Sequence, residues 1–323
     1  MLLIPLSLMF PGKVNGYAFK KFLRRVNLEN GVIQGRNMFI KIIATSLTIG
    51  SGNSAGVEGP IAQIGGALGS KVGQTMRVSG KRMKVYIAAG CAGGIAGIFN
   101  APIAGIFFAS EIVLLGSYEI SSFAALVIAS ALATVVSRAY YGEIPAFPIP
   151  DYHVINPFVE IPLYSLMAII MGVLAVLHIR FFYYVRDRFK ELPMHEQLKP
   201  VFGAFIVGTI AIAFPQIMGD GYEFIAQTLA GEGVFWVLLA LIVLKSVATA
   251  ITLGSGGAGG VFAPSLFIGA VVGGAFGNVM HWLLPDYTAT PGAYATVGIG
   301  AFLAASTHCL LYTSDAADEC VNV

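Results

Sequence analysis

One carboxylate in a glycine-rich, apolar stretch is the residue best suited to do chemistry. Glu58 lies within Gly50-Ser-Gly-Asn-Ser-Ala-Gly-Val-Glu-Gly-Pro60. Pro60 suits the first turn of a helix, where its missing N–H costs little, and the free N–H groups of such a turn attract anions. A carboxylate beside them can occupy the anion site and leave it when protonated. We therefore predict that Glu58 gates an anion site, the alternative being an acid that only caps a helix.

The same arrangement recurs later in the chain. Pro264 follows Gly259-Gly260-Val261-Phe262, and Pro102 follows Asn100, which is the expected N-cap of a third helix. Several helix N-termini that meet inside a membrane can bind an anion without a full positive charge. Phe262 occupies the position equivalent to Glu58, so the gate occurs once.

An internal duplication relates these segments at an offset of 204 residues. Between residues 40–69 and 244–273, 13 of 30 positions are identical. Asn15-Gly16-Tyr17 also recurs as Asp220-Gly221-Tyr222. Paired halves with apolar segments interrupted by Gly and Pro are typical of inverted-repeat transporters, whose site lies where broken helices meet near the middle of the membrane.

Composition excludes a soluble globular protein. Hydrophobic residues make up 56% of the 323 residues and charged residues 11%, against about 45–50% and about 25% in soluble domains. At about 20 residues for each crossing, the chain has material for roughly eight to ten membrane segments. The predicted fold class is an all-α polytopic membrane protein with broken, tilted helices that meet at a mid-membrane anion site. Basic residues concentrate in 13–36, 71–84 and 180–199, which predicts that these connections are cytoplasmic.

Three motifs resemble those of the CLC family of chloride channels and proton/chloride antiporters. Gly56-Val57-Glu58-Gly59-Pro60 resembles the family's G-[K/R]-E-G-P, and residues 259–264 resemble its G-G-x-F-x-P. Residues 99–111 are similar to the family segment that ends in its acidic residues. The resemblance covers residues 12–308 and implies the CLC-type inverted-repeat fold.

The resemblance also implies roles for individual residues. Glu58 would be the gating glutamate, and the anion would be bound at Gly56, Val57, Gly59, Gly260, Val261 and Phe262. Val57 stands where the family has a basic residue. The family's serine loop would fall near residues 12–16, which contain no serine.

Two neighbouring residues bear on proton coupling. The resemblance places Glu111 at the first of two acidic positions and Ile112 at the second, where antiporters carry an internal proton glutamate and channels an apolar residue. Channel behaviour is therefore the prediction, with a proton/chloride antiporter as the alternative. Glu111 is interpreted as a structural or entrance acid, the alternative being a proton donor.

The predicted organisation is a single membrane domain over residues 1–308, incomplete at both ends, with repeat halves at about 1–140 and 161–308. Residues 309–323 resemble a translated sequencing adaptor and are expected not to be native. We expect a multi-pass protein of the bacterial inner membrane that is not an enzyme and uses neither cofactor nor metal. Its expected partners are chloride, protons, the lipid bilayer and a second copy in a homodimer, and it binds no nucleic acid. A different class, a membrane protein that binds an anion without transporting it, remains open.

Overall fold

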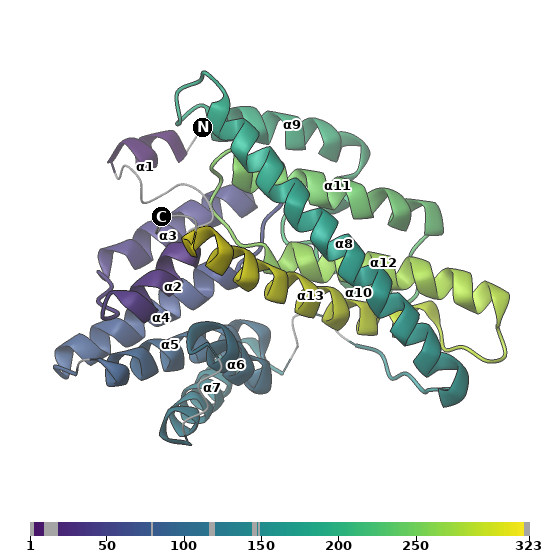
Figure 1. Cartoon of the computed structure of the whole chain (residues 1–323), viewed down its shortest axis with the longest axis horizontal. Coiled ribbons are helices and arrows are strands. Elements are labelled where there is room, and N and C mark those ends of the chain that lie inside the picture. The colour runs from purple at the N-terminus through teal and green to yellow at the C-terminus, as the bar shows by residue number, and fades with distance from the viewer. Residues whose placement is uncertain are drawn as a thin grey trace. The chain divides into compact units, whose positions relative to one another are not determined.

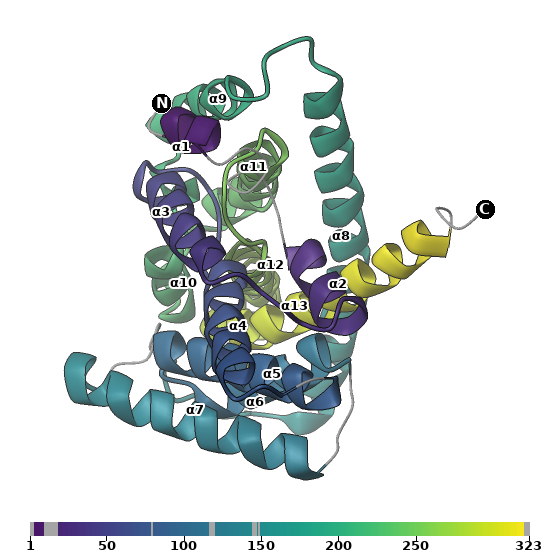
Figure 2. The same cartoon turned by 90° about the vertical axis from the view of Figure 1, so that its left-hand side faces the viewer.

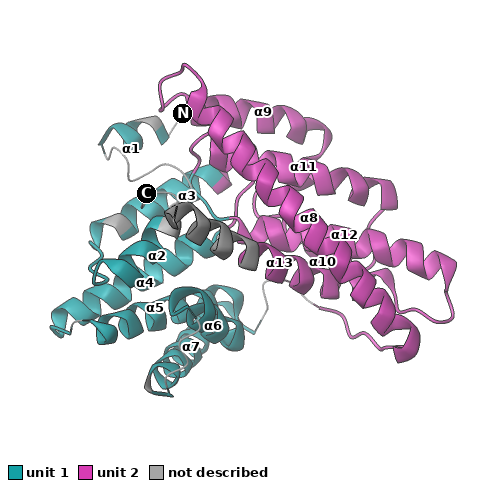
Figure 3. Ribbon diagram, in the orientation of Figure 1, with its two compact units in different colours: residues 1–48, 57–146, 258–260 teal, residues 49–56, 147–257, 261–323 magenta. Residues whose placement is uncertain are grey.

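The computed structural model describes residues 3–9, 19–78, 80–115, 120–143, 147 and 149–319. Within these residues all regular secondary structure is helical, as predicted (Figure 1). The chain forms two compact units, coloured separately in Figure 3. Unit 1 comprises residues 1–48, 57–146 and 258–260, and unit 2 comprises residues 49–56, 147–257 and 261–323. Each unit therefore includes a short segment from the other half of the sequence.

Unit 1 is built mainly on one pair of glycine-rich helices. A Cβ atom on Gly65 would collide with the carbonyl oxygen of Gly90, and one on Gly69 would collide with that of Tyr86. The helix backbones can approach this closely only because these residues lack side chains. In chain order the described helices are α1 (Leu3–Met9), α2 (Phe19–Leu28), α3 (Arg36–Gly50), α4 (Glu58–Thr75), α5 (Lys81–Phe99), α6 (Pro102–Phe108), the π-helical turn η1 (Ala109–Val113) and α7 (Ile120–Tyr141).

Unit 2 repeats this packing between α12 and α13, which lie together in Figure 2. A Cβ atom on Gly269 would lie 2.5 Å from the carbonyl oxygen of Gly298, and one on Gly298 would lie 2.5 Å from that of Gly269. Gly269 is the repeat equivalent of Gly65. The described elements of this unit are α8 (Pro157–Glu191), α9 (Lys199–Ala213), the 3₁₀ turn η2 (Pro215–Ile217), α10 (Tyr222–Leu229), α11 (Phe235–Gly254), α12 (Phe262–Leu283) and α13 (Pro291–Glu319).

Four described helices are long and apolar enough to cross a membrane. They are Ser122–Tyr141, Pro157–Glu191, Phe235–Gly254 and Phe262–Leu283. Three shorter apolar helices, Met38–Gly50, Pro102–Val113 and Lys199–Ala213, accompany them. Short and interrupted helices are what the many glycines and prolines predicted.

The longest span, α8, begins with a well-defined cap. The side chain of Asn156 accepts a hydrogen bond from the N–H of Phe158 at 3.1 Å, and Pro157 occupies the first turn. Close by, Glu160 is fully buried and accepts hydrogen bonds from Ile155 N at 3.1 Å and Ala289 N at 2.9 Å. It also accepts one from the hydroxyl of Tyr164 at 3.0 Å. Glu160 therefore links the start of α8 to the approach to α13.

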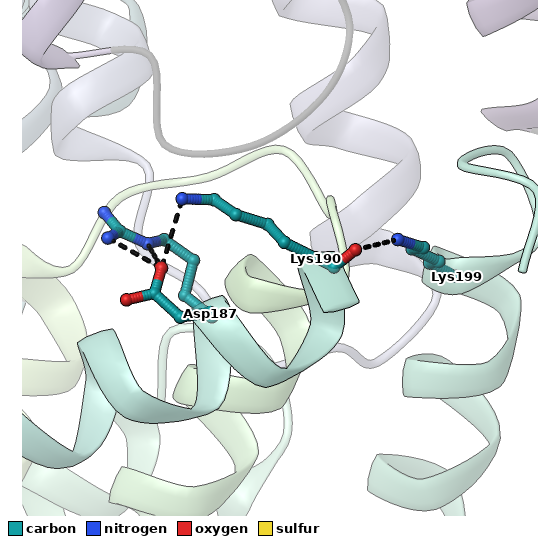
Figure 4. A network of polar contacts seen from close by, with 4 residues as sticks. Asp187, Lys190 and Lys199 are labelled. Carbon is teal, nitrogen blue, oxygen red and sulfur yellow. Dashed lines mark hydrogen bonds and ion pairs between the residues drawn. The ribbon is translucent and has the colours of Figure 1, made fainter. Parts of the chain in front are cut away.

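The other end of α8 carries a charged cluster (Figure 4). Asp187 accepts from Arg186 at 2.9 Å and from Lys190 at 3.1 Å, and Lys199 donates to the backbone carbonyl of Lys190 at 3.0 Å. These groups are largely exposed, so each ion pair contributes only about 0–1 kcal/mol. The predicted connection at residues 180–199 is shorter than expected, because α8 continues to Glu191 and includes most of its charged residues.

Candidate functional site

Glu58 is the first residue of α4 and is buried, with 4% of its surface exposed. Val57 precedes it as the N-cap, in a helical conformation (φ −89°, ψ −18°) and without a side-chain cap. The first-turn N–H groups of a helix lack intrahelical partners and carry the positive end of the helix dipole. The structure therefore places the predicted gating carboxylate at a buried helix start, where negative charge is favoured.

The second repeat builds the same turn without the acid. Val261 is the N-cap of α12, with φ −99° and ψ −7°, close to the values at Val57. Phe262 begins the helix and is buried, with Ala263 and Pro264 behind it. The duplication read from the sequence thus extends to the backbone conformation. An aromatic ring occupies the position that the carboxylate holds in the first repeat.

Glycines from the two repeats meet within unit 1. A Cβ atom on Gly59 would lie 3.5 Å from the Cα of Gly260. Nearby, the N–H of Ala258 donates to the hydroxyl of Thr48 at 3.1 Å, across 210 positions of sequence. The structure thereby brings together two of the predicted anion-binding glycines.

The segment before Glu58 is held within unit 2. The hydroxyls of Ser54 and Thr249 are hydrogen-bonded at 2.9 Å, and both residues are fully buried. The N–H of Ala55 donates to the carbonyl of Gly219 at 3.3 Å. Gly56, the next predicted anion-binding residue, is also buried.

Sequence reasoning missed the buried contacts of Lys245, although a signal was available. Lys245 is fully buried in α11, and its ammonium donates to the carbonyls of Ile217 at 3.0 Å and Gly219 at 3.1 Å. A lysine in an apolar helix is rare and calls for a named partner. Its recurrence at the same repeat position as Lys41 was the second clue.

The interpretation of Asn100 as an N-cap was wrong. Asn100 has φ +54° and closes α5 in the left-handed conformation, which asparagine tolerates well. The N-cap of α6 is Ala101, which makes no side-chain cap hydrogen bond. The Asn100 side chain instead accepts a hydrogen bond from Arg138 Nε at 2.6 Å.

Glu111 and Ile112 lie in the π-helical turn η1 and differ in exposure. Glu111 is exposed, whereas Ile112 is buried with 8% of its surface exposed. π-helical turns occur frequently at functional sites. The residue at the second acidic position of the family pattern is therefore an apolar side chain within the packed interior of unit 1. The segment at residues 12–16, where the serine loop would fall, lies outside the described residues.

Comparison with known proteins decides the family. The model of the voltage gated chloride channel family matches residues 2–314. The chain belongs to this chloride channel family. The resemblance read from the three motifs is thereby confirmed.

Relatives in the chloride channel family include both channels and exchangers by name. A ClcB-like chloride channel protein of Ralstonia nicotianae is 32% identical over 291 residues, covering 89% of this chain and 67% of the relative. The H⁺/Cl⁻ exchange transporter ClcA of Vibrio parahaemolyticus is 32% identical over 276 residues, covering 83% and 59%. The chain thus spans about two thirds or less of the length of these relatives.

A solved structure supports the chloride channel fold. A slow cyanobacterial Cl⁻/H⁺ antiporter superposes with a TM-score of 0.82 and 25% sequence identity, over 94% of this chain and 72% of the antiporter. The predicted CLC-type helical membrane fold is confirmed by this similarity.

Proposed function

We propose that the protein transports chloride through an anion pathway gated by Glu58. The observation that carries the proposal is a carboxylate, 4% exposed, at the start of α4. Ionised, it competes with an incoming anion for the first-turn N–H groups and for the positive end of the helix dipole. Protonated, it loses that attraction and releases the site to chloride.

The proposed anion ligands are backbone groups, because the two helix starts offer N–H donors without fixed positive charge. In the first repeat they belong to Gly56, Val57 and Gly59, and in the second repeat to Gly260, Val261 and Phe262. The matching backbone angles at Val57 and Val261 support equivalent roles for the two turns. Only the first of these turns carries a carboxylate, that of Glu58, which competes with the anion.

We propose channel-like transport without strict proton coupling. A proton that crosses against chloride needs a relay of ionisable groups, and Ile112 offers none at the second acidic position. Glu111, exposed on the same turn, then serves as an entrance acid. The second candidate is a proton/chloride antiporter, which is favoured by the names of the Vibrio relative and of the cyanobacterial structure.

The working form is proposed to be a homodimer in the inner membrane of a bacterium, with one pathway in each subunit. The lipid-length helices and the bacterial relatives support the location. Chloride is the transported ion, and transport needs no cofactor.

Chloride efflux from liposomes tests the proposal. The purified protein is reconstituted in vesicles loaded with KCl, and external chloride is followed with an electrode between pH 4.5 and pH 8. We expect efflux above that of protein-free vesicles, rising as the pH falls because protonation releases Glu58. Glu58→Gln imitates the protonated acid and should give fast, pH-independent efflux. Efflux no faster than from protein-free vesicles would leave only anion binding without transport, and a Glu58→Gln variant that keeps the steep pH dependence would exclude Glu58 as the gate.

A further inference from the structure

We infer that Lys245 is a positioning residue for the anion site, acting through the carbonyl of Gly219 on the segment that leads to Glu58. The inference rests on the proposed function and extends it to a residue outside the two helix starts. It joins three groups of unit 2: the ammonium of Lys245, the loop at residues 217–221 and the segment at residues 49–56.

The first step is the anchor. Lys245 is fully buried in α11, and its Nζ donates to the carbonyls of Ile217 at 3.0 Å and Gly219 at 3.1 Å. The same Nζ lies 4.7 Å from the centre of the Phe267 ring. Charge-assisted hydrogen bonds in a low-dielectric interior are roughly twice as strong as neutral ones. The loop carbonyls are therefore held firmly by one side chain.

The second step is the fit of the loop around that ammonium. Gly221 has φ +83°, and a Cβ atom there would lie 2.5 Å from Phe267 Cδ2 and 3.1 Å from Lys245 Nζ. A side chain at this position would displace both groups. The loop is thus shaped to place its backbone against Lys245 and Phe267.

The third step connects the loop at residues 217–221 to the segment at residues 49–56, which leads to Glu58. Gly219 O accepts a second hydrogen bond, from the N–H of Ala55 at 3.3 Å. Gly52 packs on Met218, since a Cβ atom there would lie 2.5 Å from Met218 Cε. Ala55 precedes Glu58 by three residues. One carbonyl oxygen therefore receives both the lysine and the backbone that leads directly to the gating acid.

The consequence is an effect on anion affinity. Without the ammonium, the Gly219 carbonyl is free to rotate, and the Ala55 N–H loses its fixed acceptor. The segment ahead of the first helix start then samples several conformations, and its N–H groups spend less time aligned on chloride. Arginine at this position keeps a charge and several donors, so it can bond both carbonyls again.

The test compares Lys245→Met, Lys245→Gln and Lys245→Arg with the unmodified protein. Chloride affinity is measured by isothermal titration calorimetry in detergent, and efflux is measured in liposomes. We expect Lys245→Met to weaken chloride binding and to slow efflux by about tenfold, because both loop carbonyls lose the ammonium and the segment before Glu58 is no longer fixed. Lys245→Gln, which keeps a neutral donor, should fall between, and Lys245→Arg should restore binding to within about twofold.

Met167→Ala is the matched control for a loss of stability alone. Met167 of α8 is fully buried in a separate core cluster that includes Met171 of the same helix and Phe302 of α13. It should lower the thermal unfolding temperature but leave the chloride affinity of the folded protein unchanged. If Lys245→Met does not fold, the comparison of Lys245→Gln with Lys245→Arg decides the question in the same way.

The outcomes separate the two claims. If the unmodified protein neither binds nor passes chloride, the proposed function fails and this inference fails with it. If it binds chloride and the methionine or glutamine variant binds equally well, only the role of Lys245 is overturned. If Met167→Ala lowers the chloride affinity as much as the Lys245 variants do, the loss comes from reduced stability alone, and the role of Lys245 is overturned as well.

Discussion

Gly65 and Gly90 face each other with their backbones in contact, because a Cβ atom on either would collide with the carbonyl oxygen of the other. Gly269 and Gly298 repeat this relationship in the second unit. Within a membrane the hydrophobic effect contributes little to helix association, because lipid tails are as apolar as the side chains. Close van der Waals packing must therefore stabilise the contact between the helices. These glycine pairs hold the helix that carries Glu58 and its repeat counterpart.

Gly65→Ala is expected to destabilise the protein by about 1–3 kcal/mol, because the added methyl forces the backbones of α4 and α5 apart. The readout is the thermal unfolding temperature in detergent, followed by far-UV circular dichroism. Gly269→Ala should have a similar effect through Gly298.

Gly208→Ala is the matched control for this prediction. Gly208 lies in α9, and a Cβ atom there would meet nothing within 4 Å. Alanine is the better helix former, so this variant should be neutral or stabilised by up to about 1 kcal/mol. Equal unfolding temperatures for the Gly65 and Gly208 variants would contradict the close packing.

The elements of the site could be predicted from the sequence because their signals are local. Glu58 is an acid beside glycines and a proline, and its helix begins where that pattern indicates. The repeat offset predicted a matching turn at Val261, which the backbone angles bear out. Membrane class followed from composition alone.

The supporting contacts could not be predicted, because they join side chains to distant backbone groups. The carbonyls that Lys245 holds belong to residues 217 and 219, and no residue type marks a backbone carbonyl as an acceptor. The prediction that Asn100 is an N-cap was wrong because asparagine is favoured both as an N-cap and in the left-handed conformation that ends a helix. In the structure Asn100 has φ +54°, so it adopts the left-handed conformation.

Removing the Glu160 carboxylate should destabilise unit 2. Glu160→Ala leaves the N–H groups of Ile155 and Ala289 and the hydroxyl of Tyr164 without the acceptor they use. The hydrogen bond from Ala289 N is fully buried, and a buried donor left without a partner costs about 1–3 kcal/mol, so a loss of at least about 1 kcal/mol is expected. Chemical denaturation monitored by tryptophan fluorescence measures it.

Glu143→Ala serves as the comparison. Its carboxylate is 85% exposed and lies 3.9 Å from Arg138. Exposed substitutions of this kind change stability by no more than about 0.5 kcal/mol. If both glutamate variants unfold at the same denaturant concentration, the buried acid does not anchor α8.

A positive charge at Val57 should speed chloride entry. The family pattern carries a basic residue here, and Val57 is only partly buried at the N-cap of α4. Val57→Lys is expected to raise chloride efflux a few-fold in about 20 mM salt by concentrating anions locally, and the gain should shrink at about 500 mM salt because the charge is then screened.

The control is Val57→Met, which adds length without charge. It should leave the rate and its salt dependence close to those of the unmodified protein. A lysine variant that speeds efflux equally at both salt concentrations would show that the effect is not electrostatic attraction.

A carboxylate at Ile112 should introduce proton coupling. Ile112 is buried on the π-helical turn and occupies the position of the second acid in the family pattern. Ile112→Glu supplies an ionisable group there, so a chloride gradient imposed on liposomes should drive proton movement that the unmodified protein does not show. The measurement is the pH of a weakly buffered external solution, with Ile112→Leu as the control that keeps an apolar side chain.

Chloride-driven proton movement in the unmodified protein would replace the channel proposal with the antiporter. If Ile112→Glu still passes chloride but moves no protons, a carboxylate at this position alone does not complete a proton path.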